Sequence, residues 1–198
     1  ALSLVLFAAA TDEGRPLLTG AKLVQRKEET IIAATDGYRL SVYRLPLGFA
    51  DGTDAVLPAR ALGELVRVCQ EEKEEKRVLF YRVVEGQVCV QVGDTEIITR
   101  QIDGQYPSYE KIIPPRFTTR ATLDPQPLLR AAKTASLFAR DSANIVRFRL
   151  DAHSLTVSAN SPQTGEGAVQ IDAKVEGDGG DIAFNSRFLL ELLALGVD

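Results

Sequence analysis

The sequence predicts an α+β fold made of two similar domains, and three observations lead to this prediction. Short stretches rich in Val, Ile and Leu are separated by turn residues, which indicates antiparallel hairpins because too few residues intervene for crossover helices. Four other segments repeat their apolar residues with a helical period. Finally, a motif in the first third of the chain recurs close to its end, which is typical of tandem copies of one domain.

The expected strands lie mostly in the first part of the chain. Alternation of apolar and polar residues, as in RLSVYRL, favours strands that are buried on one face. The stretches with this character are residues 21–26, 30–34, 39–45, 77–83, 87–92 and 96–101, with glycine-containing turns at 85–86, 93–94 and 103–104. In the second copy, residues 119–123 and 155–159 have the same character.

Helices are expected where apolar residues recur at intervals of three and four. The four segments are residues 1–10, 58–69, 125–139 and 185–195. The second has an apolar stripe formed by Leu62, Leu65, Val66 and Cys69. Asn185 can act as the N-cap of the last segment, because its side chain can accept a hydrogen bond from a free amide of the first turn.

The internal repeat aligns DAVLPARALGEL (residues 54–65) with DIAFNSRFLLEL (residues 181–192) without a gap, at an offset of 127 residues. The identical pairs are Asp54/Asp181, Arg60/Arg187, Leu62/Leu189, Glu64/Glu191 and Leu65/Leu192. So large an offset indicates two copies of a whole domain rather than a solenoid. A chance match of two strand–helix units is the alternative.

The repeat also predicts where the domains are divided and what each lacks. We expect one domain over residues 1–118 and the second over residues 119–198. The strand and helix that open the second copy have no full counterpart before residue 1, and the strands at 77–101 have none after residue 198. With no Met in the sequence, we expect a piece of a longer tandem array, cut at both ends.

Composition excludes several classes of protein. With 45% apolar and 25% charged residues, the chain is globular rather than disordered. The longest apolar run, residues 2–10, is far shorter than the roughly 18 residues of a membrane span, and no signal peptide is evident. The two cysteines fit neither a disulfide framework nor a metal motif. We therefore expect a cytoplasmic protein without a membrane partner, metal or other cofactor.

No motif of enzymatic chemistry is found. The sequence lacks the glycine-rich phosphate-binding patterns and the nucleophile elbow. The single histidine, His153, falls in an expected turn, and the acidic run at 71–76 is expected to be a solvated loop. A hydrolase that uses Asp94, Glu96 and Asp103 is an alternative, but it lacks a positioned base or a metal cluster.

Basic residues share helix faces. Arg130, Lys133 and Arg140 lie within about 80° of one another on a helical wheel of 100° per residue. Arg60 and Arg67 are seven residues apart and therefore share a face. With acidic residues expected mainly in loops and strand edges, these faces could bind phosphates despite the net charge of −4. From the residues alone, ordinary solvated helix faces are an equal alternative.

Several motifs resemble one known family, the bacterial DNA polymerase III beta subunits, or sliding clamps. TDEGRPLLTG (11–20), ATDGYRLSVYRLPLG (34–48), LPARALGEL (57–65) and VGDTEIITRQIDGQYPSYEKIIP (92–114) resemble the second domain of that family in order and spacing. FARDSANIVR (138–147) and IAFNSRFLLELL (182–193) resemble its third domain. The likeness covers essentially the whole chain.

The resemblance implies the DNA clamp fold and a non-catalytic processivity factor. In that family a head-to-tail homodimer forms a ring, with helices lining the hole and antiparallel sheets outside. The implied partners are double-stranded DNA of any sequence, the alpha subunit of the replicative DNA polymerase, the clamp loader and other proteins with a clamp-binding motif. A stand-alone peptide-binding module of the same fold, without a ring, is the alternative.

The resemblance also implies two sets of site residues. The implied peptide-binding residues are Arg15, Leu18, Thr35, Gly37, Tyr38, Arg39, Leu40, Pro107, Lys111, Ile112, Asn185 and Phe188. Among them Leu18, Leu40, Pro107 and Ile112 are expected to receive an apolar anchor of the partner. The implied DNA-facing residues are Arg60 and Arg67, to which the wheel argument adds Arg130 and Lys133.

Overall fold

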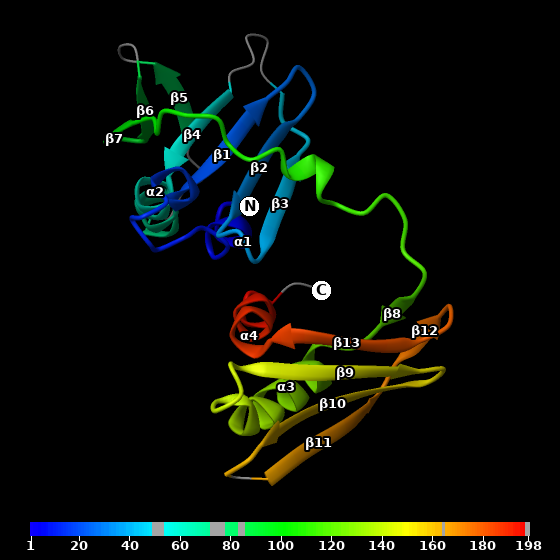
Figure 1. Cartoon of the computed structure of the whole chain (residues 1–198). Coiled ribbons are helices and arrows are strands. Elements are labelled where there is room, and N and C mark those ends of the chain that lie inside the picture. Colours follow the sequence, from blue (N-terminus) through cyan, green and yellow to red (C-terminus); the bar gives the residue numbers. More distant parts are fainter. Residues whose placement is uncertain (49–53, 72–77, 83–85, 164, 197–198) are drawn as a thin grey trace. The chain divides into compact units, whose positions relative to one another are not determined.

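The computed structural model describes residues 1–48, 54–71, 78–82, 86–163 and 165–196, and for residues 79–82 only the backbone. The chain consists of two compact units, unit 1 (Ala1–Ile112) and unit 2 (Ile113–Asp198) (Figure 1). From the sequence, the division was expected a few residues later, between residues 118 and 119. Residues 72–76 of the acidic run lie outside the described residues.

Unit 1 has antiparallel sheets and helices, as an α+β fold requires. Its elements are α1 (Ser3–Leu6), the 3₁₀-helix η1 (Pro16–Thr19), β1 (Gly20–Gln25), β2 (Thr30–Thr35), β3 (Leu40–Leu45), β4 (Asp54–Pro58), α2 (Ala59–Glu71), β5 (Val78–Arg82), β6 (Gln87–Val92), β7 (Thr95–Arg100) and the 3₁₀-helix η2 (Tyr109–Lys111). One sheet has the strand order β3-β2-β1-β4, and the other has the order β5-β6-β7.

Both faces of the first sheet of unit 1 are covered. Along β2, Ile32 and Ala34 belong to the main core, where α1 and α2 pack together with β6. Ala33 points to the opposite face, as the period of two in a strand requires. There it contacts Tyr106 and Tyr109, which follow β7 in the sequence. Figure 1 shows this stretch after β7 crossing the strands on its way to η2.

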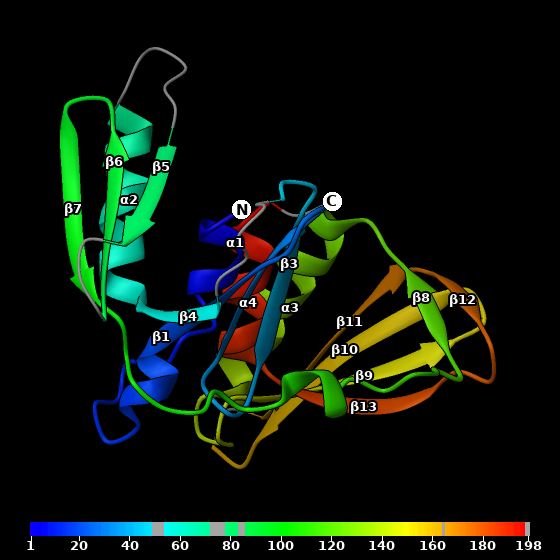
Figure 2. The same cartoon turned by 90° about the horizontal axis from the view of Figure 1, so that it is seen from above.

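Unit 2 is also built from antiparallel strands and two helices. Its elements are β8 (Arg120–Thr122), α3 (Pro125–Ala139), β9 (Ile145–Asp151), β10 (Ser154–Ser161), β11 (Gly165–Asp172), β12 (Lys174–Glu176), β13 (Gly180–Asn185) and α4 (Ser186–Ala194). The main sheet has the order β11-β10-β9-β13, and β12 pairs with β8. Helix α3 packs against β9, β10, β11 and α4, which Figure 2 shows from above.

The two units share one topology, which confirms the internal repeat. The order β3-β2-β1-β4 in unit 1 corresponds strand by strand to β11-β10-β9-β13 in unit 2, and in both the last strand leads directly into a helix, α2 or α4. The repeated aspartates are also used alike. Asp54 lies 2.7 Å from Arg26 and Asp181 lies 3.1 Å from Arg149, each arginine belonging to the adjacent strand or its end.

Most predicted elements are present within one or two residues, and one is much shorter. A helix was expected over residues 1–10, but only Ser3–Leu6 is α-helical. After Leu6 the amides of Ala8 and Ala9 bond to carbonyls three residues back, so the turns tighten. The amide of Ala10 then bonds to the carbonyl of Leu18 at 2.9 Å, which draws the chain away from the helix axis.

Within the described part of the chain, no helix is both long and apolar enough to cross a membrane.

Candidate functional site

The loop between β2 and β3 carries three of the predicted peptide-binding residues, Gly37, Tyr38 and Arg39, and is held by its own polar groups. Oδ1 of Asp36 accepts hydrogen bonds from the amides of Tyr38 at 2.9 Å and Arg39 at 3.0 Å. Oγ1 of Thr35 donates to the carbonyl of Arg39 at 2.6 Å and accepts from the amide of Gly37 at 3.0 Å. These bonds fix the loop, and Tyr38 extends from it with 81% of its surface exposed.

Arginine side chains brace the same loop. Nε of Arg39 donates to Oδ2 of Asp36 at 3.0 Å, in an ion pair whose side chains are only 18% and 13% exposed. The guanidinium of Arg39 also lies 5.3 Å from the ring centroid of Phe7. Nη1 of Arg15 donates to the carbonyl of Asp36 at 2.8 Å. The side chains of Arg39 and Arg15, both predicted peptide-binding residues, therefore hold the loop.

Gly37 is required where it stands in this loop. Its φ is +91°, in the region that favours glycine. A Cβ on Gly37 would also lie 3.1 Å from Nη1 of Arg15. Asp36 was not among the predicted site residues, although Thr-Asp-Gly is a turn signal in which an aspartate often bonds the backbone.

The segment that follows β7 brings Pro107, Lys111 and Ile112 to the same unit. Pro107 and Lys111 are exposed, and Ile112 is 68% exposed. The segment is anchored by Tyr106 and Tyr109, which are 6% and 3% exposed. Burial raises the pKa of both phenols above the usual value, so both stay protonated at neutral pH.

The residues predicted to receive the apolar anchor do not all contact the same apolar cluster. Leu40 packs against the apolar cluster formed by Ala33, Val56, Tyr106 and Tyr109, on the face of the sheet opposite the main core. From η1 it is Leu17 that joins this cluster, whereas the half-buried Leu18 bonds through its carbonyl to Ala10. Leu17 was missed because two adjacent leucines in a 3₁₀-helix give no period that distinguishes them.

Asn185 and Phe188 belong to unit 2, where they begin helix α4. Oδ1 of Asn185 accepts from the amide of Arg187 at 3.0 Å, which confirms the predicted N-cap. Phe188 is half-buried in the first turns of α4.

The predicted DNA-facing residues of α2 are exposed, and one of them is held by acids. Nε of Arg67 lies 2.9 Å from Glu64 and Nη1 lies 2.7 Å from Glu71. Hydrogen bonds to Glu64 and Glu71 raise the pKa of the Arg67 guanidinium. The expectation that acidic residues lie mainly in loops and strand edges is therefore wrong for α2, where carboxylates one helical turn from Arg67 share its face.

Helix α3 has the more basic surface. Arg130, Lys133 and Arg140 are exposed at its outer face or end, and no acidic residue lies within Pro125–Ala139. Arg187 was not among the predicted DNA-facing residues, although it is exposed in α4 at the position that Arg60 has in α2. The repeat contained this signal, because Arg60 and Arg187 are one of its identities.

The groups of the hydrolase alternative lie on the surface. Asp94, Glu96 and Asp103 are exposed in a turn, in β7 and after β7, and His153 is exposed between β9 and β10. Among the described residues, no group of three or more His, Cys, Asp and Glu side chains could hold a metal ion.

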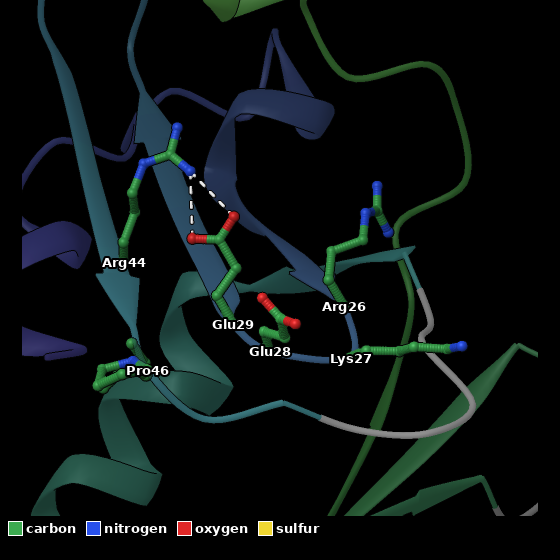
Figure 3. Close-up of a pocket in the computed structure, with 7 residues that line it drawn as sticks. Arg26, Lys27, Glu28, Glu29, Arg44 and Pro46 are labelled. Atoms are coloured by element: carbon green, nitrogen blue, oxygen red, sulfur yellow. Dashed lines mark hydrogen bonds and ion pairs between the residues drawn. The ribbon is translucent and has the colours of Figure 1, made fainter.

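A hollow of about 520 Å³ lies at the opposite end of β2 from the loop of Tyr38 (Figure 3). It is lined by Arg26, Lys27, Glu28, Glu29, Arg44, Leu45 and Pro46. Arg44 points to Glu29 in Figure 3, with Nη1 3.2 Å from Oε1, and Arg26 pairs with Asp54. Three of its charged residues, Arg26, Glu29 and Arg44, are paired within the protein, and none of the predicted site residues lines it.

Comparison with protein families gives two adjacent matches. The family model of the DNA polymerase III beta subunit, central domain, matches residues 1–108. The model of the C-terminal domain of the same subunit matches residues 110–195.

Curated relatives and solved structures agree with these matches. The beta sliding clamp of Synechocystis sp. is 31% identical over 201 residues, which cover 94% of this chain and 51% of the relative. The beta sliding clamp of Staphylococcus aureus is 30% identical, with 94% and 50% covered. The crystal structure of the DNA polymerase III beta chain from Streptococcus pneumoniae has a TM-score of 0.88 at 29% identity, with 98% of this chain and 52% of that chain covered. The DNA polymerase sliding clamp from Bacillus subtilis has a TM-score of 0.87 at 28% identity, again with 98% and 52% covered. The chain thus spans about half the length of these relatives.

Proposed function

The chain belongs to the bacterial DNA polymerase III beta-subunit family, the sliding clamps, and we propose that it is part of a clamp that encircles duplex DNA and tethers a polymerase. One observation carries the proposal: two successive family domains match the chain from residue 1 to residue 195, and the two units have one topology. A ring of similar domains needs such a repeated unit, and the main sheet of each unit leads from its last strand directly into a helix.

We propose that Tyr38, Pro107 and Ile112 of unit 1 belong to a peptide-binding site. Tyr38 extends from a loop fixed by Asp36 and Thr35, and Pro107 and Ile112 are exposed on a segment anchored by two buried tyrosines. An exposed aromatic and exposed apolar residues on rigid supports are suited to binding an apolar anchor with little loss of entropy. Asn185 and Phe188 of unit 2 are also proposed to bind the peptide.

We propose that the helices contact DNA through phosphates. Arg60 of α2, Arg130 and Lys133 of α3 and the newly added Arg187 of α4 are exposed cations on helices. Such contacts are independent of sequence, as a clamp that moves along DNA requires. Arg67 is expected to contribute less, because Glu64 and Glu71 must release it before it can pair with a phosphate.

We propose that the protein is an accessory factor without catalytic activity of its own and that it acts in the cytoplasm. Its proposed partners are double-stranded DNA, the alpha subunit of the replicative polymerase, the clamp loader and other proteins with a clamp-binding motif. The ring is proposed to be a homodimer of the complete subunit. A stand-alone peptide-binding module without a ring remains the second candidate, supported by the fact that the loop of Tyr38 is fixed within unit 1 alone.

The peptide-binding site is tested with substitutions that spare the core. We expect Pro107→Asp and Ile112→Asp to weaken binding of a fluorescein-labelled peptide from the C-terminus of the same organism's replicative polymerase. The loss is at least about tenfold, because each charge meets an apolar anchor. Fluorescence anisotropy measures the peptide affinity of the 198-residue chain and of the protein encoded by the complete reading frame.

Ile98→Asp is the matched control, because Ile98 is 59% exposed on β7 of the same unit. All three variants should keep the unfolding temperature of the unmodified protein. Equal peptide affinity in the control and in both site variants would remove this surface from the proposed site.

A further inference from the structure

The hydroxyl of Tyr106 stands at the point where β1 and β2 separate. The paired residues of these strands end with Lys22 opposite Ala33. If the register continued, Gly20 would face Thr35, but β1 instead continues beside β4, with Gly20 opposite Pro58. The Tyr106 hydroxyl lies at this opening: it accepts from the amide of Thr35 at 3.1 Å and donates to the carbonyl of Gly20 at 3.4 Å.

This hydroxyl replaces the next strand-to-strand contact of the sheet. Thr35 and Tyr106 are each 6% exposed, so water has little access to the bonded groups. A buried amide or carbonyl without a partner costs about 1–3 kcal/mol. The Tyr106 phenol can both donate and accept, so one hydroxyl serves the Thr35 amide and the Gly20 carbonyl together.

Tyr106 also connects the two segments of unit 1 that carry the proposed peptide site. On one side, Thr35 leads directly into the loop of Gly37 and Tyr38 and bonds that loop through its own hydroxyl. On the other side, Tyr106 immediately precedes Pro107. The nearest upstream attachment of its segment is the bond from the amide of Ile102 to the carbonyl of Val56 at 2.8 Å.

We propose that Tyr106 is a positioning residue for peptide binding, whose hydroxyl sets the loop of Tyr38 against the segment of Pro107. This inference rests on the proposed function. The phenol contacts no peptide itself; it acts through the Thr35 amide on one segment and through its own backbone on the other. Without the hydroxyl the two segments lose this direct bond between them, and fewer molecules have the binding arrangement at any moment.

The test compares Tyr106→Phe with Tyr109→Phe in the complete protein. Both phenols are buried in the same apolar cluster, but the Tyr109 side chain bonds to Glu110 in its own segment, and Tyr109→Phe keeps the buried ring that anchors this segment. The probe is the labelled polymerase C-terminal peptide, and three quantities are measured: the dissociation constant, the association rate constant and the amide exchange rate of Thr35.

We expect Tyr106→Phe to weaken peptide binding about three- to tenfold, as the loss of a bridging bond implies. The loss should appear in the association rate constant, because the bound state still forms once the segments meet. The Thr35 amide should exchange faster, and Tyr109→Phe should change none of the three quantities.

Two results would overturn the inference. One is peptide affinity in Tyr106→Phe equal to that in Tyr109→Phe while Pro107→Asp still weakens binding, which leaves the proposed site intact and removes Tyr106 from it. The other is unchanged exchange of the Thr35 amide, which contradicts the bridge itself. If Pro107→Asp also has no effect, the proposed function fails instead.

Discussion

Replacing Asn185 with alanine separates two roles that the site assigns to one side chain. Oδ1 of Asn185 caps helix α4 by accepting from the amide of Arg187 at 3.0 Å. Loss of an N-cap side chain costs about 1 kcal/mol of unfolding free energy, because the amide loses its partner. For a unit the size of Ile113–Asp198, this corresponds to a fall in Tm of about 4–8 °C.

Asp124 offers the matched control within the same unit. It caps α3 in the same way, accepting from the amide of Gln126 at 2.9 Å. Asp124→Ala and Asn185→Ala should therefore lower the free energy of unfolding by similar amounts, measured by urea denaturation. Only Asn185→Ala should also weaken binding of the polymerase peptide, because Asn185 alone belongs to the proposed site.

Asn185→Ser tests the separation directly, since serine caps a helix about as well as asparagine. We expect this variant to keep the stability of the unmodified protein and still to lose peptide affinity. Unchanged stability in Asn185→Ala, with the expected loss in Asp124→Ala, would refute the capping role. Full peptide affinity in Asn185→Ser would exclude its amide from the site.

The remaining predictions concern DNA, packing and pH. Replacing Arg130 and Lys133 of α3 with Gln should reduce the slope of log DNA affinity against log salt concentration by about 0.9 per lost phosphate contact. Replacing Arg67 with Gln should reduce this slope less, because Arg67 is paired with Glu64 and Glu71. Filter binding at several salt concentrations measures both slopes. Gly167→Ala should lower the free energy of unfolding by about 1–3 kcal/mol, because its Cβ would lie 2.4 Å from the ring of Phe138. Gly63→Ala, with nothing within 4 Å, should instead raise it by about 0.5–1 kcal/mol in a denaturant titration. The free energy of unfolding should fall as pH rises above about 10, because burial raises the folded-state pKa of Tyr106 and Tyr109 and the unfolded chain then releases protons first. Replacing either tyrosine with phenylalanine should make that fall smaller.

The regular elements could be predicted because their signals are local. The apolar stripe of α2 and the alternation in β3 follow from the periods of helix and strand, and both are present within two residues of the prediction. The repeat gave the shared topology of the units, since Asp54 and Asp181 begin or enter equivalent strands. The end of α1 was missed, because the amide of Ala10 bonds to a residue eight positions later, and no local period reports such a contact.

Only part of the proposed site could be predicted from the sequence, because some of its residues act through hydrogen bonds between segments that lie far apart in the chain. The resemblance supplied Thr35, Gly37 and Tyr38, and the Thr-Asp-Gly turn is visible in the sequence. The roles of Asp36 and Tyr106 depend on hydrogen bonds across the fold: Arg15 lies 21 positions from Asp36, and Tyr106 lies 71 positions from Thr35. Such bonds follow from how the segment after β7 crosses the sheet, which propensity and spacing do not determine.

The central claim, that the protein surrounds DNA, is tested most directly by the topology of its attachment. The protein encoded by the complete reading frame is loaded by its clamp loader onto nicked circular DNA. It should remain bound during gel filtration at a salt concentration that disrupts phosphate contacts. Cutting the circle with one restriction enzyme should then release it, because a ring slides off a free end. Equal retention on circular and linear DNA would contradict the account, and so would loss from both at high salt.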